Sequence, residues 1–238
     1  MDRVYRMKVR LTSYDVGPDR TLKPSSLLRI IQEVAGRHLE QDGLSYEHMR
    51  SKGIVFLLAR ECVKIKSHPH CEETITAETW FHKCEGVRFV RNVRLLNEGG
   101  QVLIEAATQW IITDPETHKI LRPSEFTFSM PRIEENCVNL DFRKIKMPQG
   151  AAAAGTRAVR WSDIDCNCHM NNTVYADIIC DFFPGGMFDR KLSEFQIDYS
   201  NEALLGDEIN VLTAETEDGG CCFEGAVEGK KCFIAFAK

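Results

Sequence analysis

Residues 9–15, VRLTSYD, recur at residues 159–165 as VRWSDID. Each copy is followed by a polar loop, then by an apolar pattern with helical spacing, and then by segments that alternate as β-strands do. Similarity at such a separation indicates a repeated structural unit. The sequence therefore predicts two related halves, each with a strand, a helix and an antiparallel sheet.

The first helix is predicted to begin near Pro24, which suits a first helical turn, and to end at Gly43. The positions that form its apolar face are Leu27, Leu28, Ile31, Val34, Ala35 and Leu39. In the second half, Asn171 and Asn172 are candidate helix N-caps. The helix that follows them has its apolar stripe at Tyr175, Ile178 and Ile179.

Strand patterns follow each helical pattern. They cover residues 54–65, 73–84, 87–96 and 102–113 in the first half, and 194–200, 208–216, 221–227 and 232–237 in the second. A long helix needs the apolar face of a sheet to cover it, and two such units side by side can join their sheets. The predicted fold class is α+β, with a first unit at residues 1–130, an irregular linker at 131–156 and a second unit at 157–238.

Residues 160–175, RWSDIDCNCHMNNTVY, are dense in functional side chains. Asp165, Asn167 and His169 are spaced two apart, so in an extended segment all three would lie on one face. A carboxylate, an amide and an imidazole beside the positive end of a helix are suited to polarising a carbonyl and moving a proton. Asp165 could instead only cap a turn, since Asp often does so.

The same stretch resembles the acyl-ACP thioesterase family. Residues 161–175 are similar to that family's signature W-x-D-x-D-x-N-x-H-x-N-N-x-x-Y, and residues 86–123 resemble its central strand pair. The resemblance covers nearly the whole chain. It implies a tandem, or double, hotdog fold, in which each unit is a long helix wrapped by an antiparallel sheet and the two sheets are continuous.

The resemblance also implies a catalytic set of Asp165, Asn167, His169 and, on a later strand, Glu202. Where the family has Cys after this Glu, the chain has Ala203, which counts against a thiol nucleophile and favours carboxylate-assisted attack by water. Either Asp165 or Glu202 could take the proton or attack directly. His169 could shuttle a proton near pH 7, and backbone N–H groups near Asn171 and Asn172 could polarise the carbonyl.

The first repeat keeps Asp15 but lacks the Asn and the His, so the chain is expected to hold one active site. The first half would then shape the acyl pocket and set the chain length. The pocket candidates are Leu27, Leu28, Ile31, Val34, Phe56, Leu58, Trp80 and Trp110. The alternative for each is plain core, because large apolar residues are most often simply buried.

Ten cysteines at irregular spacing favour reduced thiols in a cytoplasmic protein. Cys166, Cys168 and His169 do not have zinc-site spacing, so no metal or other cofactor is expected. Because Cys166 and Cys168 alternate with the polar face of the motif, they are predicted to point into the core.

Composition and charge limit the classes of partner that the protein is expected to bind. A net charge of −5 gives no indication of a nucleic-acid partner, and no apolar run reaches membrane-spanning length. The start of the chain lacks the apolar core of a signal peptide. The resemblance implies acyl carrier protein as partner, an acidic protein that needs a basic surface. The available residues are Arg88, Arg91, Arg94, Lys119, Arg122, Arg143, Lys144 and Lys146.

The expected function is hydrolysis of medium or long fatty acyl-ACP thioesters by a monomer or homodimer. An acyl-CoA thioesterase is the alternative among enzymes, although no convincing cradle for the CoA diphosphate is visible. A hydratase of the same fold fits the motif less well. A non-catalytic acyl-carrier-binding module is the alternative from another class, and the intact polar set argues against it.

Overall fold

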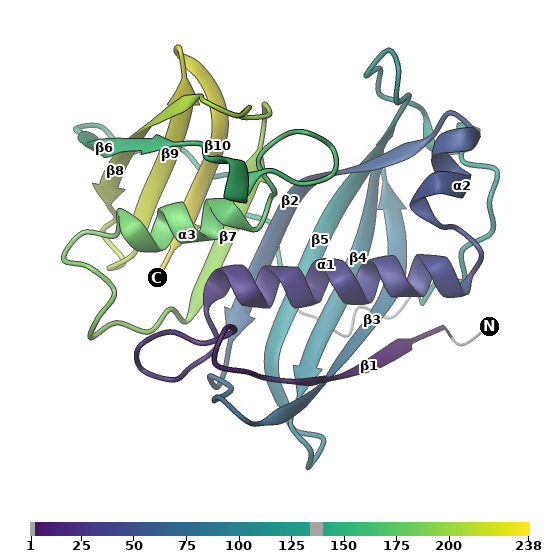
Figure 1. Cartoon of the computed structure of the whole chain (residues 1–238), viewed down its shortest axis with the longest axis horizontal. Helices are drawn as coiled ribbons and strands as arrows, with labels where there is room; N and C mark the ends of the chain where they lie inside the picture. The colour runs from purple at the N-terminus through teal and green to yellow at the C-terminus, as the bar shows by residue number, and fades with distance from the viewer. Residues whose placement is uncertain (1–2, 134–139) are drawn as a thin grey trace.

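The computed structural model describes residues 3–133 and 140–238. The strands of this part of the chain form one antiparallel sheet of ten strands in the order β1-β3-β4-β5-β2-β7-β10-β9-β8-β6 (Figure 1). Their bounds are Tyr5–Arg10 (β1), Val55–Ile65 (β2), Thr74–Glu85 (β3), Arg88–Leu96 (β4), Val102–Thr113 (β5), Ala152–Ala158 (β6), Glu194–Tyr199 (β7), Glu208–Glu215 (β8), Cys221–Val227 (β9) and Lys230–Ala237 (β10). The prediction of one continuous sheet is therefore confirmed.

The strand predictions agree with the structure to within two residues, and residues 102–113 match without a shift. The irregular segment ends earlier than predicted, because β6 begins at Ala152, inside the predicted linker 131–156. β6 is an edge strand whose first five residues are exposed, and it pairs only with β8. An exposed run of Ala and Gly shows no alternation, so the sequence pattern could not indicate this strand. Residues 134–139 of the linker lie outside the described residues.

The two main helices differ in length. α1, Pro24–Gln41, has 18 residues; it begins at Pro24 as predicted and ends two residues before the predicted stop at Gly43. α3, Val174–Asp181, has only eight residues, so the expectation of a long helix in each unit is wrong for the second unit. The chain reaches Pro184 and two glycines just after α3, and Pro disfavours helical backbone in the residue before it.

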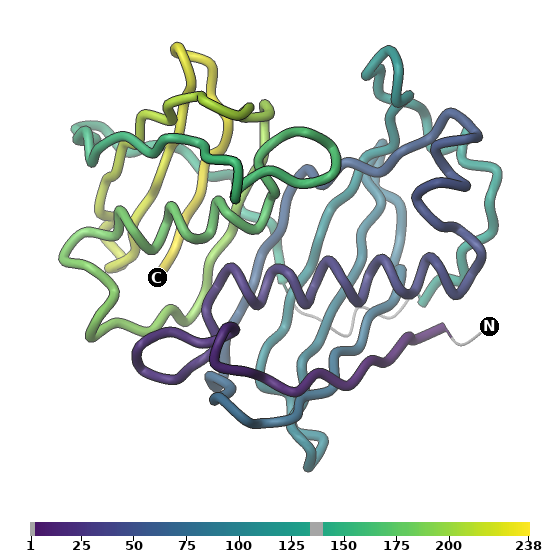
Figure 2. Tube along the Cα trace, viewed as in Figure 1, coloured from purple at the N-terminus to yellow at the C-terminus, as the bar shows by residue number. Residues whose placement is uncertain are grey.

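Shorter helices complete the fold. α2, Tyr46–Ser51, was not predicted; the Ser45 hydroxyl caps it by accepting from the N–H of His48. Two short 3₁₀ turns, η1 and η2, cover Pro123–Glu125 and Trp161–Asp163. α1 and α3 lie on the same face of the sheet and contact each other (Figures 1 and 2). Between them and the sheet lies the main apolar core, which includes Leu28, Ile178 and Phe233.

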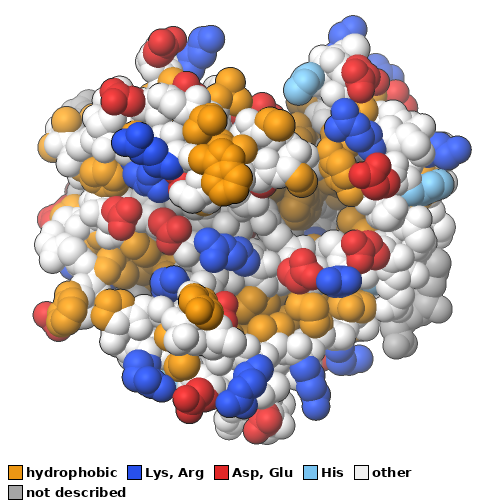
Figure 3. Space-filling model, in the orientation of Figure 1, with side chains coloured by type: hydrophobic (Ala, Val, Ile, Leu, Met, Phe, Trp, Pro, Cys, Tyr) orange, Lys and Arg blue, Asp and Glu red, His pale blue; other side chains and the backbone are white. Residues whose placement is uncertain are grey.

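The junction between the two units positions the site. β2 pairs with β5 along its whole length, but with β7 only from Arg60 to Lys64. The first residues of β2 therefore extend past the end of β7 at Tyr199 and leave a notch in the sheet. In the space-filling view, a hollow edged by hydrophobic side chains opens above α1, between the two halves (Figure 3).

Candidate active site

The motif that follows Arg160 is a tight loop and not an extended segment. The N–H of Cys168 donates to the carbonyl of Asp165, and the N–H of Asp165 donates to the carbonyl of His169. Cys168 has a φ of 66°. The carboxylate of Asp165 accepts from the N–H of Asn167 at 2.8 Å. This Asx turn replaces the extended backbone that a strand would need. The prediction of one shared face is therefore wrong for this segment.

The same turn corrects the prediction for the two cysteines of the motif. Cys166 and Cys168 are exposed, and neither side chain points into the core. Their expected burial depended on strict alternation along a strand, which the loop does not have.

Asp165 and Asn171 connect the loop to α3. The second carboxylate oxygen of Asp165 accepts from the side-chain amide of Asn171 at 3.2 Å. The Oδ1 of Asn171 in turn accepts from both the N–H and the hydroxyl of Thr173, the residue before α3. The N–H of Val174 donates to the carbonyl of Asn171. Both oxygens of Asp165 are thus engaged in shaping the loop, and Asn171 closes the turn before the helix.

His169 and Glu202 face each other across 3.8 Å, measured from Nε2 to Oε1. The His169 side chain is 14% exposed and that of Glu202 is 46% exposed. The other ring nitrogen, Nδ1, is 3.3 Å from the carbonyl of Met170. Because a carbonyl can only accept, this contact assigns the ring proton to Nδ1 and leaves a lone pair on Nε2. An imidazolium formed by protonation of Nε2 would face the Glu202 carboxylate.

Glu202 lies in the loop after β7, not on a strand as expected. The N–H of Met170 donates to the carbonyl of Ala203 at 2.8 Å and ties this loop to the motif. Ala203 is fully buried, so the position that follows the carboxylate is a packing position in this chain.

His169 and Glu202 line a cavity of about 160 Å³ in the notch between β2 and β7. Its other lining residues are Leu57, Leu58, Ala59, Ile111, Met170, Asn172, Tyr175, Tyr199, Ser200 and Asn201. Asp165 and Asn167 belong to the same loop but lie outside this lining. Of the four predicted catalytic residues, the structure thus brings two together in one cavity.

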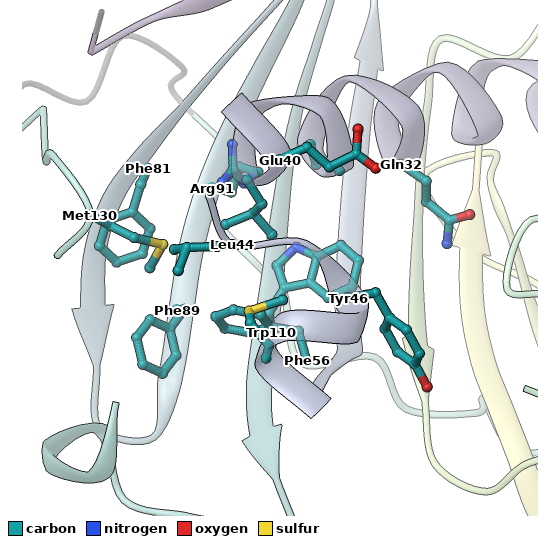
Figure 4. A pocket seen from close by; sticks show the side chains of 14 residues that line it. Gln32, Glu40, Leu44, Tyr46, Phe56, Phe81, Phe89, Arg91, Trp110 and Met130 are labelled. Carbon is teal, nitrogen blue, oxygen red and sulfur yellow. The ribbon is translucent and has the colours of Figure 1, made fainter. Parts of the chain in front are cut away.

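Asn167 instead reaches the first unit. The hydroxyl of Tyr46, the first residue of α2, donates to its Oδ1 at 3.0 Å. Tyr46 also lines an apolar cavity of about 210 Å³ between α1, α2 and the sheet. In the close view, Gln32 and Tyr46 lie at one end of this cavity and Phe81 and Met130 at the other (Figure 4). The bond therefore joins the motif loop to one end of an apolar pocket.

The structure distributes the predicted acyl-pocket residues over four places, of which Trp80 occupies the last, described below. Phe56 and Trp110 line the apolar cavity, and Leu58 lines the smaller one. Leu27, Leu28, Ile31 and Val34 are buried in the core and line neither cavity. The α1 residues along the cavity are Gln32, Ala35, Gly36, Leu39 and Glu40.

Trp80 belongs to the other face of the sheet. It pairs with Asn92, whereas its neighbours Thr79 and Phe81 pair with Val93 and Arg91. The Arg94 guanidinium lies over its ring at 5.0 Å. Side chains alternate between the two faces of a strand, so Trp80 points away from α1 and its cavity.

The comparisons with known proteins agree with this arrangement. The sequence matches the acyl-ACP thioesterase N-terminal domain over residues 2–127 and the corresponding C-terminal domain over residues 149–231. The chain belongs to the acyl-ACP thioesterase family.

Two plant members of this family illustrate the similarity. A palmitoyl-acyl carrier protein thioesterase of Cuphea hookeriana is 26% identical over 238 residues, which are 91% of this chain and 56% of that protein. An oleoyl-acyl carrier protein thioesterase of Arabidopsis thaliana is 26% identical over 246 residues, 94% of this chain and 67% of that protein. The chain thus spans little more than half the length of the Cuphea protein.

Solved structures of acyl-ACP thioesterases share the fold. One from Bacteroides thetaiotaomicron superposes with a TM-score of 0.91 at 19% identity, over 99% of this chain and 97% of that one. The 12:0-ACP thioesterase of Umbellularia californica superposes with a TM-score of 0.86 at 18% identity, over 100% and 97% of the two chains. The fold is the double hotdog, as the sequence resemblance implied.

Two buried polar clusters were missed by sequence reasoning. Arg91, expected on a basic surface, is fully buried at the apolar cavity, where it bonds to His38 at 3.0 Å. Burial and the nearby Arg91 lower the pKa of His38 to about 4. Glu61 on β2 is buried beside Tyr199, and burial raises its pKa to about 8. The available signal was a charged residue at an inward-facing strand position.

Proposed function

We propose that this protein hydrolyses fatty acyl thioesters of acyl carrier protein, releasing a free fatty acid and the carrier thiol. The observation that carries the proposal is that this member of the acyl-ACP thioesterase family has two neighbouring cavities. The cavity lined by His169 and Glu202 lies near a second, apolar cavity, and the Tyr46–Asn167 bond connects their surroundings. A thioester needs both a site for its carbonyl and a dry channel for its tail.

The chemistry assigned to the polar cavity is attack by water. Water adds to the carbonyl carbon as its proton passes to the lone pair on Nε2 of His169, and the Glu202 carboxylate stabilises the imidazolium. Collapse of the intermediate breaks the C–S bond, and the departing thiolate takes the proton back. Between the two carboxylates, Glu202 suits this role better, because both oxygens of Asp165 already accept bonds within the loop.

The developing oxyanion needs a hydrogen-bond donor from the residues around the start of α3. The N–H groups of Thr173 and Val174 donate to the Oδ1 and the carbonyl of Asn171. They are therefore engaged at the start of α3. Asn172, which lines the cavity, is the better candidate to contact the carbonyl oxygen.

The carrier, the location and the pathway belong to the same proposal. Relatives named as acyl carrier protein thioesterases support the carrier protein as partner. We place the protein in the cytoplasm, acting on products of fatty acid synthesis, although the plant relatives are named chloroplastic. None of the helices in the described ranges is long and apolar enough to cross a bilayer.

The test is release of free thiol from acyl-ACP and from acyl-CoA across a series of chain lengths. The proposal expects turnover of acyl-ACP with higher kcat/KM than the CoA ester of the same acid. A faster reaction with acyl-CoA would move the assignment to the alternative enzyme. Binding of acyl-ACP without any thiol release would indicate a non-catalytic module.

A further inference from the structure

Glu61 is a carboxyl group inside the main core. It lies on β2 opposite Thr108 of β5 and opposite Ile197 of β7, and it is 1% exposed. The hydroxyl of Tyr199 hydrogen-bonds to its Oε1, whereas Oε2 is buried with no hydrogen-bond partner in the described part of the chain. A buried carboxylate with a single partner would be costly, so its protonation state is decided by what surrounds it.

The contacts of Tyr199 show where a proton is needed. Its hydroxyl is bonded to Glu61 and is also 3.1 Å from the backbone carbonyl of Asn172. A phenol has one hydrogen to donate, and neither a carboxylate nor a carbonyl has any. Both contacts can be separate, two-centre hydrogen bonds only if Glu61 itself carries a proton. Glu61 then donates to the oxygen of Tyr199, and Tyr199 donates to the carbonyl of Asn172.

We propose that protonated Glu61 is a positioning residue, which directs the Tyr199 hydroxyl to the carbonyl of Asn172 and so holds one wall of the catalytic cavity. Tyr199 and Asn172 both line the cavity that contains His169 and Glu202. The two hydrogen bonds, from Glu61 to Tyr199 and from Tyr199 to Asn172, therefore connect the core with the catalytic cavity. This inference rests on the proposed hydrolase function for its kinetic consequences, but not for its chemistry.

Among the described residues, none of the groups around Glu61 offers a compensating cation. Tyr175 of α3 packs edge-on against Tyr199, with 5.4 Å between ring centroids. Arg60, next along β2, forms an ion pair with Asp198 at 2.9 Å on the opposite face of the sheet. The thiol of Cys62 has its own pKa raised to about 12 by burial, so it stays neutral. Thr108 and Ile197, across the sheet, carry no charge.

Loss of the proton from Glu61 reverses its hydrogen bond with Tyr199. The pKa of Glu61 is raised to about 8 by burial, so the protonated form prevails below that pH and the carboxylate above it. A Glu61 carboxylate takes the hydrogen of Tyr199 for itself and releases the carbonyl of Asn172. We therefore expect kcat to fall as pH rises through about 8, with little change in the KM that the acyl tail determines.

The decisive variant is Glu61→Gln, whose side-chain amide donates to Tyr199 at every pH. Its kcat should show no decline between pH 7 and 10, whereas the unmodified protein declines several-fold. Tyr199→Phe should lower kcat at all pH values and also remove the decline. Glu78→Gln is the matched control, because Glu78 is a buried carboxylate paired with Arg6 and Arg94 away from this cluster; it should keep the decline.

A second measurement does not depend on turnover. The infrared difference spectrum between pH 7 and pH 10 should lose a carboxylic acid C=O band in the unmodified protein and not in Glu61→Gln. An equal alkaline decline in both proteins, or no band lost, would overturn the inference. If the protein hydrolyses no thioester while the band is still lost, the proposed function fails and the protonation of Glu61 stands.

Discussion

The two units of the molecule have the same arrangement of a helix over a sheet, but they differ in the lengths of the helix and the strands. In the first, α1 of 18 residues lies over four strands of nine to twelve residues, β2 to β5, with the six-residue β1 at the edge. In the second, α3 of eight residues lies over strands of six to eight. The longer unit has room for an apolar cavity beneath its helix, and the shorter one carries the polar loop at its edge.

Two glycines show the difference in packing. Gly36 is an exposed position of α1 at the rim of the cavity, and a Cβ added there would meet nothing within 4 Å. A Cβ added to Gly225 on β9 would overlap the ring of Phe233 and the side chain of Ile209. Gly225 is therefore closely packed in the core of the second unit, whereas α1 of the first unit has open space at the rim of its cavity.

The largest expected effect is on chemistry in the second unit. His169→Ala removes the lone pair that faces Glu202, and the loss of a general base typically costs about 10²- to 10⁴-fold in rate. The fall in kcat should be equal for short and long acyl chains, since the imidazole acts on the carbonyl. Thiol release measured across a chain-length series checks this. A loss confined to long chains would mean that His169 serves the tail.

The next effect tests close packing in the second unit. Gly225→Ala forces Phe233 to move, and overpacking of this kind costs about 1–3 kcal/mol of stability. We expect a lower Tm, with the chain-length profile of the remaining activity unchanged. Gly36→Ala, which adds the same methyl group to open space, is the matched comparison and should not lower Tm. Equal destabilisation of both variants would contradict the difference between the units.

Gly36→Leu tests the open space of the first unit. The added side chain would fill part of the apolar cavity, and each methylene of substrate that it excludes forfeits about 0.8 kcal/mol. Exclusion of two or three methylenes would shift chain-length preference by more than about tenfold. Competition between a short and a long acyl-ACP measures the shift, with Gly36→Ala as control. A uniform loss for all lengths would show that the tail lies elsewhere.

The sequence predicted most strands and the whole of α1, because alternation and helical spacing report directly on which face is buried. It could not tell which apolar face of α1 borders a cavity. Leu28 and Gly36 belong to the same helix, yet Leu28 is core and Gly36 lines the pocket. A helical pattern identifies burial, and empty space appears only once the neighbouring elements are in place.

The site was harder to predict than the fold. Spacing of two residues suggested an extended motif, but the Asp165 side chain captures the N–H of Asn167 and turns the chain. The family resemblance predicted Glu202 together with His169, but no pattern within the chain did, because their proximity depends on the bond between Met170 and Ala203, which joins segments more than thirty residues apart. Such contacts depend on tertiary structure and leave no periodic signal.

The smallest expected effect concerns the bond between the two units at the site. Tyr46→Phe removes the hydroxyl that donates to Asn167 but keeps the ring that lines the cavity. The bond is exposed, so water can replace it, and a net loss of about 1 kcal/mol is expected. That corresponds to roughly fivefold in kcat/KM, by the same factor for every chain length, since the bond positions the loop and not the tail. Tyr14→Phe removes a hydroxyl from a tyrosine that is 85% exposed and should change nothing. If Tyr46→Phe altered chain-length preference instead, the hydroxyl would belong to the pocket of the first unit, and the two units would be coupled elsewhere.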